Sequence, residues 1–130
     1  MSQGLDRYRW EHRLVLLISS SEDQALFQQQ IDILSDDLEG IRERKLLIIH
    51  MKPLLAKIVL PELCELSLKK SEFKRFSQGE SPFSFILIGL DGGVKLRQNE
   101  VVSREYLYAL IDGMPMRRAE MRAKKNKPQP

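Results

Sequence analysis

The sequence predicts an α/β fold: a mixed four-stranded sheet with helices on both faces and a basic C-terminal helix. Residues 14–18, 46–49 and 83–90 are compact apolar runs, typical of strands covered on both faces. An apolar stripe at helical spacing separates the first two runs. An Asp-Gly-Gly turn at residues 91–93 then leads into residues 94–97, where apolar and charged residues alternate as in a strand near a sheet edge.

Residues 21–41 are expected to form one helix between the first two strands. Ser21 and Gln24 resemble a capping box at its start, and Gly40 is expected to end it. A strand–helix–strand order implies that the two strands pair in parallel through a right-handed crossover. The stripe that would face the sheet consists of Phe27, Ile31, Leu34, Leu38 and Ile41.

Residues 53–78 have a mostly helical character, interrupted by Pro61. Cys64 lies among leucines in this stretch, so we expect a buried, unreactive thiol. After the predicted hairpin, Ser103 is expected to cap the last core helix, with Val102 and Leu107 packed together around the cap.

Charge divides the chain at Pro115. Six of the 21 basic residues but only one of the 18 acidic residues lie in residues 115–130, so this tail carries +5 and residues 1–114 carry −2, which together give the net charge of +3. We therefore expect a domain over residues 1–114, followed by a basic helix and a disordered tail over residues 115–130. The exposed bases of that helix are candidates for a partner or anion surface: Arg117, Arg118, Arg122, Lys124 and Lys125.

No apolar run approaches the roughly 20 residues that cross a membrane, so no membrane span is expected. The first residues lack the apolar segment of a signal peptide. This indicates a cytoplasmic protein, or an exported one if a signal peptide has been removed.

Few residues are suited to catalysis or metal binding. The single cysteine, Cys64, has no ligand-type spacing to His12 or His50, so neither a metal site nor a cofactor is expected. Tyr8 and Trp10 alternate with arginines. They can stack on nucleic acid bases, but we favour the interpretation that they fix the N-terminal segment to the core while the arginines stay solvated.

Three motifs extend the argument beyond composition. They are Tyr8-Arg9-Trp10; Leu87-Ile88-Gly89 with Asp91-Gly92-Gly93 and Lys95; and Ile111-Asp112-Gly113-Met114-Pro115-Met116-Arg117 with Glu120-Met121. The order of elements resembles the thioredoxin fold, and these motifs resemble an uncharacterised thioredoxin-like domain family. That family is common in bacteria and has relatives in animal extracellular sushi-repeat and coiled-coil matrix proteins.

This resemblance draws attention to a missing thiol. Thioredoxin-like oxidoreductases place a cysteine after the first strand, where the helix N-terminus stabilises a thiolate. Ser19, Ser20 and Ser21 occupy that place here. The resemblance also implies a cis peptide bond between Ser81 and Pro82. Together with the serines, these two residues would form a polar groove for an anion or an extended peptide.

The sequence therefore favours a non-catalytic thioredoxin-like binding or structural module that acts on protein partners. One alternative is an enzyme that uses Cys64, or the groove formed by Ser19, Ser20 and Ser21. The other is a nucleic acid binder that uses the basic tail, which we rank last because such charge runs are more often solvated than specific.

Overall fold

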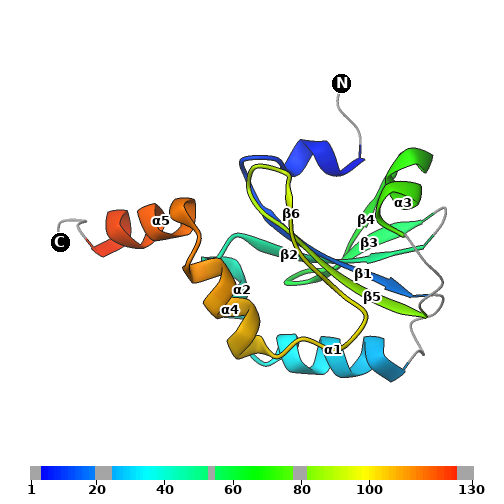
Figure 1. Ribbon diagram of the computed structural model, residues 1–130, viewed down its shortest axis with the longest axis horizontal. Coiled ribbons are helices and arrows are strands. Elements are labelled where there is room, and N and C mark those ends of the chain that lie inside the picture. The colour runs from blue at the N-terminus through cyan, green and yellow to red at the C-terminus, as the bar shows by residue number, and fades with distance from the viewer. Residues whose placement is uncertain (1–3, 20–24, 53–54, 78–81, 126–130) are drawn as a thin grey trace.

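Figure 1 shows the computed structural model, which describes residues 4–19, 25–52, 55–77 and 82–125. The strands are β1 (Arg13–Ser19), β2 (Leu46–Met51), β3 (Ala56–Leu60), β4 (Cys64–Leu66), β5 (Phe83–Ile88) and β6 (Val94–Gln98). The helices are the 3-10 helix η1 (Gly4–Tyr8) and α1 (Ala25–Ser35), α2 (Leu38–Glu43), α3 (Lys70–Phe76), α4 (Arg104–Asp112) and α5 (Pro115–Lys125).

The strands form one sheet in the order β4-β3-β2-β1-β5-β6. Strand β1 pairs in parallel with β2, with Leu16 opposite Ile49, and antiparallel with β5, with Leu16 opposite Ile86. The β5–β6 hairpin adds an edge strand, as the Asp-Gly-Gly turn predicts. The predicted strands and their directions are confirmed, and the fold class with them.

The expectation of helix over residues 53–78 is wrong for its first half. Strands β3 and β4 extend the sheet from four strands to six, and only α3 is helical there. In β3 the buried residues Ala56, Ile58 and Leu60 alternate with half-buried ones, which is the pattern of a strand. Neighbouring apolar residues also fit a helical period, and pairing with β2 decides between the two.

Helices cover both faces of the sheet. The side chains of β1 alternate between two apolar clusters, with Val15 and Leu17 in one and Leu14 and Leu16 in the other. The first cluster packs under α1, α2 and α4, and the second under η1 and α3. All seven residues of β1 are buried, which explains why its sequence is apolar from Leu14 to Ile18.

The helix expected over residues 21–41 is two helices in the described part of the chain. Asp37 interrupts it, because its carboxylate accepts the Gly40 backbone N–H at 3.1 Å and begins α2. Gly40 therefore lies inside α2 and does not end a helix. A Cβ at Gly40 would clash with the Asp37 carboxylate and would lie 2.8 Å from the Tyr108 hydroxyl of α4, so a larger residue there would have to displace these side chains. The expected Ser21 cap lies outside the described residues.

The last two helices, α4 and α5, begin where the sequence predicts. The Ser103 hydroxyl accepts the Tyr106 backbone N–H at 3.1 Å, and Val102 and Leu107 are both buried beside this cap. Helix α5 begins at Pro115, and Figure 1 shows it at one end of the molecule beyond α4 and β6. The domain boundary after residue 114 stays a prediction.

Candidate functional site

The end of β1, where the missing thiol would lie, carries a buried serine–histidine pair. The Ser19 hydroxyl lies 2.9 Å from Nε2 of His50. His50 follows the apolar residues of β2, the strand that pairs with β1. The His50 ring packs against the Phe27 ring of α1, with 4.3 Å between ring centroids. This contact could not be predicted from the sequence, because Ser19 and His50 become neighbours only when β1 and β2 pair.

A serine beside a histidine is the first half of a nucleophilic site, since the imidazole can take the hydroxyl proton. Burial argues against that role here. Ser19 is 4% exposed and His50 1% exposed, which leaves the hydroxyl without access for a substrate. The arrangement instead satisfies two polar side chains inside the core.

The groove expected at this end of the sheet is described only in part. Ser19 pairs with Phe83 of β5, so Pro82 lies at the same end, where it is exposed. Ser20, Ser21 and Ser81 lie outside the described residues, and so does the Ser81–Pro82 peptide bond.

A pocket of about 200 Å³ adjoins His50 on the β3–β4 side. Lys52, Lys57 and Glu65 are among its lining residues. Lys57 stands directly opposite Glu65 across the β3–β4 ladder, so the charges there are mixed. This pocket is neither strongly apolar nor strongly basic.

Cys64 is exposed, so the expectation of a buried thiol is wrong. It stands on β4, the edge strand, and its sulfur donates a weak hydrogen bond to the Glu65 carbonyl at 3.5 Å. Three strand spacings separate β4 from β1, a distance of roughly 14 Å. Cys64 is therefore remote from the end of β1.

The candidate partner or anion surface on α5 does not include Arg117, because this residue is buried. Arg117 is only 3% exposed. Its Nε donates to Asp112 Oδ1 at 2.9 Å and its Nη1 to the Glu43 carbonyl at 3.2 Å. Burial opposes the charge on Arg117, but the hydrogen bonds to Asp112 and Glu43 outweigh it and raise the pKa of the guanidinium.

Arg117 belongs to a cluster of arginines and carboxylates that fastens α5 to the body; we call it the arginine cluster. Arg13, at the first position of β1, is 1% exposed and donates to both carboxylate oxygens of Glu120 in α5. The expectation that the N-terminal arginines stay solvated is wrong for Arg13. The members of the arginine cluster are Arg13, Arg44 and Arg117 with Glu43, Asp112 and Glu120.

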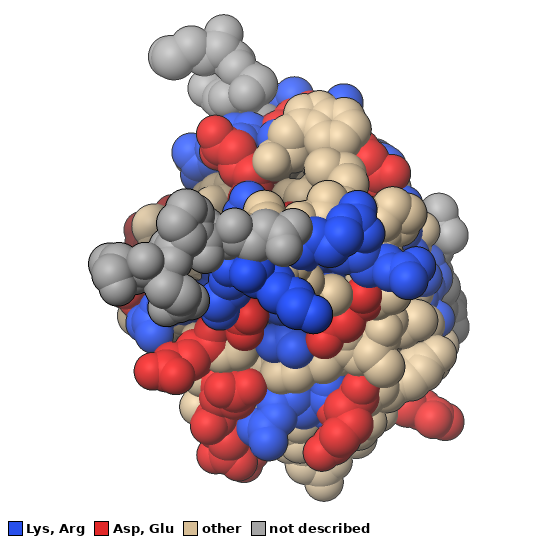
Figure 2. All heavy atoms as spheres, turned by 90° about the vertical axis from the view of Figure 1, so that its left-hand side faces the viewer, with Lys and Arg blue, Asp and Glu red and all other residues tan. Residues whose placement is uncertain are grey.

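The other bases of α5 divide into two kinds. Lys124 pairs with Glu43 at 3.2 Å. Arg118, Arg122 and Lys125 are exposed and have no ion pair with any residue that the structure describes. Figure 2, which faces this end of the molecule, shows Lys and Arg gathered in a band across its middle with Asp and Glu below.

An apolar groove lies beside this basic helix, between the β5–β6 hairpin and the junction of α4 with α5. Its volume is about 650 Å³. We call it the hairpin–helix groove. Most of its lining is apolar, including Leu90, Leu110, Met114, Pro115 and Met116.

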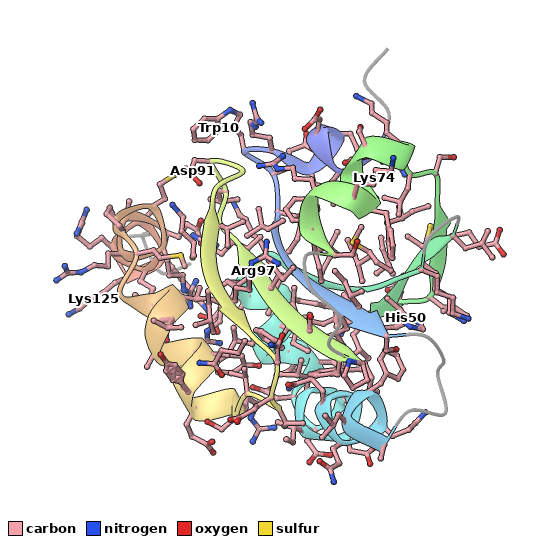
Figure 3. All side chains as sticks on the ribbon, turned by 45° about the vertical axis from the view of Figure 1, so that its right-hand side comes forward. Trp10, His50, Lys74, Asp91, Arg97 and Lys125 are labelled. Carbon is pink, nitrogen blue, oxygen red and sulfur yellow. The ribbon has the colours of Figure 1, made fainter. Side chains whose placement is uncertain are left out.

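Trp10 adjoins the groove, contrary to the expectation that it packs in the core. Its indole is 59% exposed, whereas Tyr8 is half-buried against the second apolar cluster. The Trp10 backbone N–H donates to the carbonyl of Leu90 at 2.7 Å, and Leu90 lines the groove. Figure 3 shows Trp10 beside Asp91 at the tip of the hairpin, and His50 on the other side of the molecule from Lys125.

Neither a metal centre nor a membrane span is found in the described ranges. No group of three or more His, Cys, Asp or Glu side chains is arranged there to hold a metal ion. The helices of residues 4–125, leaving out the gaps given above, are too short or too polar to cross a bilayer.

The fold and the site together define a thioredoxin-like α/β domain without a thiol at the end of β1. Solved structures support the fold. The reduced 2-Cys peroxiredoxin of Plasmodium vivax is similar with a TM-score of 0.55 and 15% identity, over 93% of this chain and 84% of that one. Thioredoxin peroxidase I of Plasmodium yoelii is similar with a TM-score of 0.54 and 12% identity, over 97% and 83%.

The sequence itself matches a family over most of its length. The family described as Domain of unknown function (DUF4174) matches residues 4–120. The chain belongs to this family. The match reaches into α5 as far as Glu120, the partner of Arg13.

Proposed function

We propose that this chain is a non-catalytic thioredoxin-like module that binds a protein partner. The observation that carries the proposal is the buried Ser19–His50 contact at the end of β1. In thioredoxin-like enzymes the thiolate follows the first strand, at the N-terminus of a helix. The chain has no cysteine between residues 13 and 35, and Ser19, the last residue of β1, is buried and hydrogen-bonded to His50. The chain's one cysteine stands on the far edge of the sheet.

Redox turnover needs more than an exposed thiol. A disulfide exchange cycle within one chain requires a second cysteine, and peroxide reduction requires a thiolate that the site stabilises. Cys64 has no second cysteine in the chain. No basic side chain of the described residues donates a hydrogen bond to its sulfur.

One observation favours a second candidate, a serine-dependent enzyme, because Ser19 and His50 have the spacing of a nucleophile and its base. A fluorophosphonate probe tests it, since such probes react with activated serines. We expect Ser19 to remain unlabelled. Labelling that is lost in Ser19→Ala and His50→Gln would favour the enzyme.

The proposed kinship with a domain of animal sushi-repeat and coiled-coil matrix proteins rests on the three motifs around residues 8–10, 87–95 and 111–121.

Turnover assays test the proposal as a whole. The chain is incubated with hydrogen peroxide and a thiol reductant, and separately with insulin and a thiol reductant, and each assay is repeated with Cys64→Ser. We expect both proteins to match the blank. Consumption of either substrate by the wild-type chain alone, with kcat above about 1 s⁻¹, would make it an enzyme and overturn the proposal.

A further inference from the structure

We propose that the hairpin–helix groove, with Trp10 on one side and the exposed bases of α5 on the other, docks an acidic amphipathic segment of a partner protein. The inference rests on the proposed function, since it names the binding surface of that module and the chemistry of its partner.

The groove has the size and lining that an apolar anchor needs. Its volume of about 650 Å³ lies within the roughly 300–1,000 Å³ that ligand sites commonly have. Leu90 and Leu110 lie on its walls, and Met116 stands 41% exposed beside them. Methionine adapts to differently shaped apolar partners, so this lining suits side chains from another chain.

Trp10 is held in position at a conformational cost. Its backbone has φ of 71°, a region that bulky residues rarely adopt, and the 2.7 Å hydrogen bond to the Leu90 carbonyl fixes it there. With this backbone conformation Trp10 is 59% exposed, whereas Tyr8, two residues earlier, is half-buried. Tryptophan is among the residues most enriched in binding hot spots.

The charges beside the groove select the partner. Residues three and four apart are neighbours on a helix, so Arg118 and Ala119 adjoin Pro115, which lines the groove. Arg122 and Lys125 continue the line from Arg118, at spacings of four and three. This basic stripe therefore runs along the helix from the groove outward, and its bases are exposed and unpaired within the described part of the chain.

A segment lying in the groove and along α5 meets apolar side chains on one face and positive charges at its edge. Its complement is an amphipathic segment with leucine-like anchors and glutamate or aspartate beside them. A second copy of this chain would bring two basic stripes together, which like-charge repulsion disfavours. A nucleic acid strand would satisfy the bases but leave the apolar walls unfilled.

Peptide selection on the full chain tests this inference without assuming the partner. A display library of random peptides of about 16 residues, enough for four helical turns, is selected on the wild-type protein and counter-selected on Met116→Asp/Arg122→Glu. We expect enriched peptides to combine acidic residues with apolar residues three and four apart. Enrichment of basic or uncharged peptides, or none at all, would overturn the inference.

Trp10 is the only tryptophan in the chain and lies beside Asp91, which lines the groove, so a peptide that reaches this end of the groove should change its emission. A synthetic enriched peptide should shift this emission to the blue. Its Kd should rise at least about tenfold in Met116→Asp and in Arg122→Glu, because each change removes a central contact. Lys74→Glu is the matched control, since Lys74 is an exposed base of α3 on another part of the surface, and its Kd should change less than about twofold.

Two further results distinguish a failure of this inference from a failure of the proposed function. Peptides that bind the wild-type chain and Met116→Asp/Arg122→Glu equally would show that the groove is not the binding surface. They would still support the proposed function of a module that binds protein. Absence of any enriched peptide would count against both. Displacement of the peptide by a single-stranded oligonucleotide or by phosphatidylserine vesicles, each binding more tightly, would assign the surface to that ligand and overturn the inference.

Discussion

Arg13, the first residue of β1, and Glu120, in α5, form a two-pronged ion pair across 107 positions of sequence. Its N–O distances are 3.2 and 3.1 Å. Arg13 is 1% exposed, and its Nη1 also donates to the Arg44 carbonyl at 2.9 Å. The basic helix is therefore joined to the sheet by a buried charge, although its outer surface is solvated.

Removing the carboxylate should destabilise the whole fold. Glu120→Gln leaves Arg13 buried without its countercharge, and we expect unfolding free energy to fall by about 2–4 kcal/mol. Urea denaturation measures this. Arg118→Gln, an exposed change in the same helix, is the control and should stay within about 0.5 kcal/mol of wild type. Equal stability of the two variants would show that the ion pair contributes nothing.

Gln30 fastens α1 to the segment before α4. Its side chain is fully buried, donates to the Val102 carbonyl at 2.9 Å and accepts the Val102 N–H at 2.7 Å. Gln30→Met keeps the side-chain volume but leaves the Val102 carbonyl and N–H without their hydrogen-bond partner. We therefore expect the free energy of unfolding to fall by about 3 kcal/mol. Gln29→Met, at an exposed neighbouring position, should have little effect in the same thermal or urea assay. A similar Tm for both variants would contradict this role.

The Tyr108 hydroxyl should titrate late. Burial, followed by the nearby Asp37 carboxylate, raises the pKa of Tyr108 from 10.0 to about 12. The unfolded chain loses this proton first, so the resulting stabilisation is complete below pH 10 and is lost as pH rises towards 12. The difference in tyrosinate absorbance between wild type and Tyr108→Phe measures the pKa directly. A midpoint near the ordinary value would refute the assignment.

Acid should weaken the arginine cluster. Burial tends to raise the pKa of Asp112, but hydrogen bonds from Arg44 and Arg117 outweigh it, so the pKa lies below its ordinary value. A lowered carboxyl pKa stabilises the fold above the unfolded pKa, and this stabilisation disappears as pH falls through the folded pKa. Urea midpoints between about pH 2 and pH 6 should therefore depend less on pH in Asp112→Asn than in wild type. Parallel curves would exclude Asp112 as a source of acid sensitivity.

Local pattern was enough to predict strands β1, β2, β5 and β6 and the starts of the last two helices. Residues 14–18 and 83–90 are apolar because both faces of β1 and β5 are covered, and Ser103 caps α4 through a contact three residues away. Such signals are read from neighbours in sequence. Residues 56–60 misled because their apolar spacing fits both periods, and only pairing with β2 selects a strand.

The site residues were harder to predict, because their roles arise from contacts between distant segments. Arg13 precedes an apolar run and gives no sign that Glu120 will reach it. His50 lies 31 positions from Ser19 and reaches it only because β1 and β2 pair. Arg117 and Arg118 are adjacent bases in the sequence, yet only one of them is exposed, because helix α5 turns the other towards Asp112.

The central claim is that this thioredoxin-like chain has no redox function. Its most direct test is the rate at which the Cys64 thiolate of the native chain reacts with hydrogen peroxide. Mass spectrometry can follow sulfenic acid formation on the reduced chain, with Cys64→Ser as the blank. We expect a second-order rate constant within about tenfold of that of a small free thiol under the same conditions. A rate constant more than about a thousandfold higher would show that the fold activates this sulfur, and would contradict the non-catalytic function proposed for the chain.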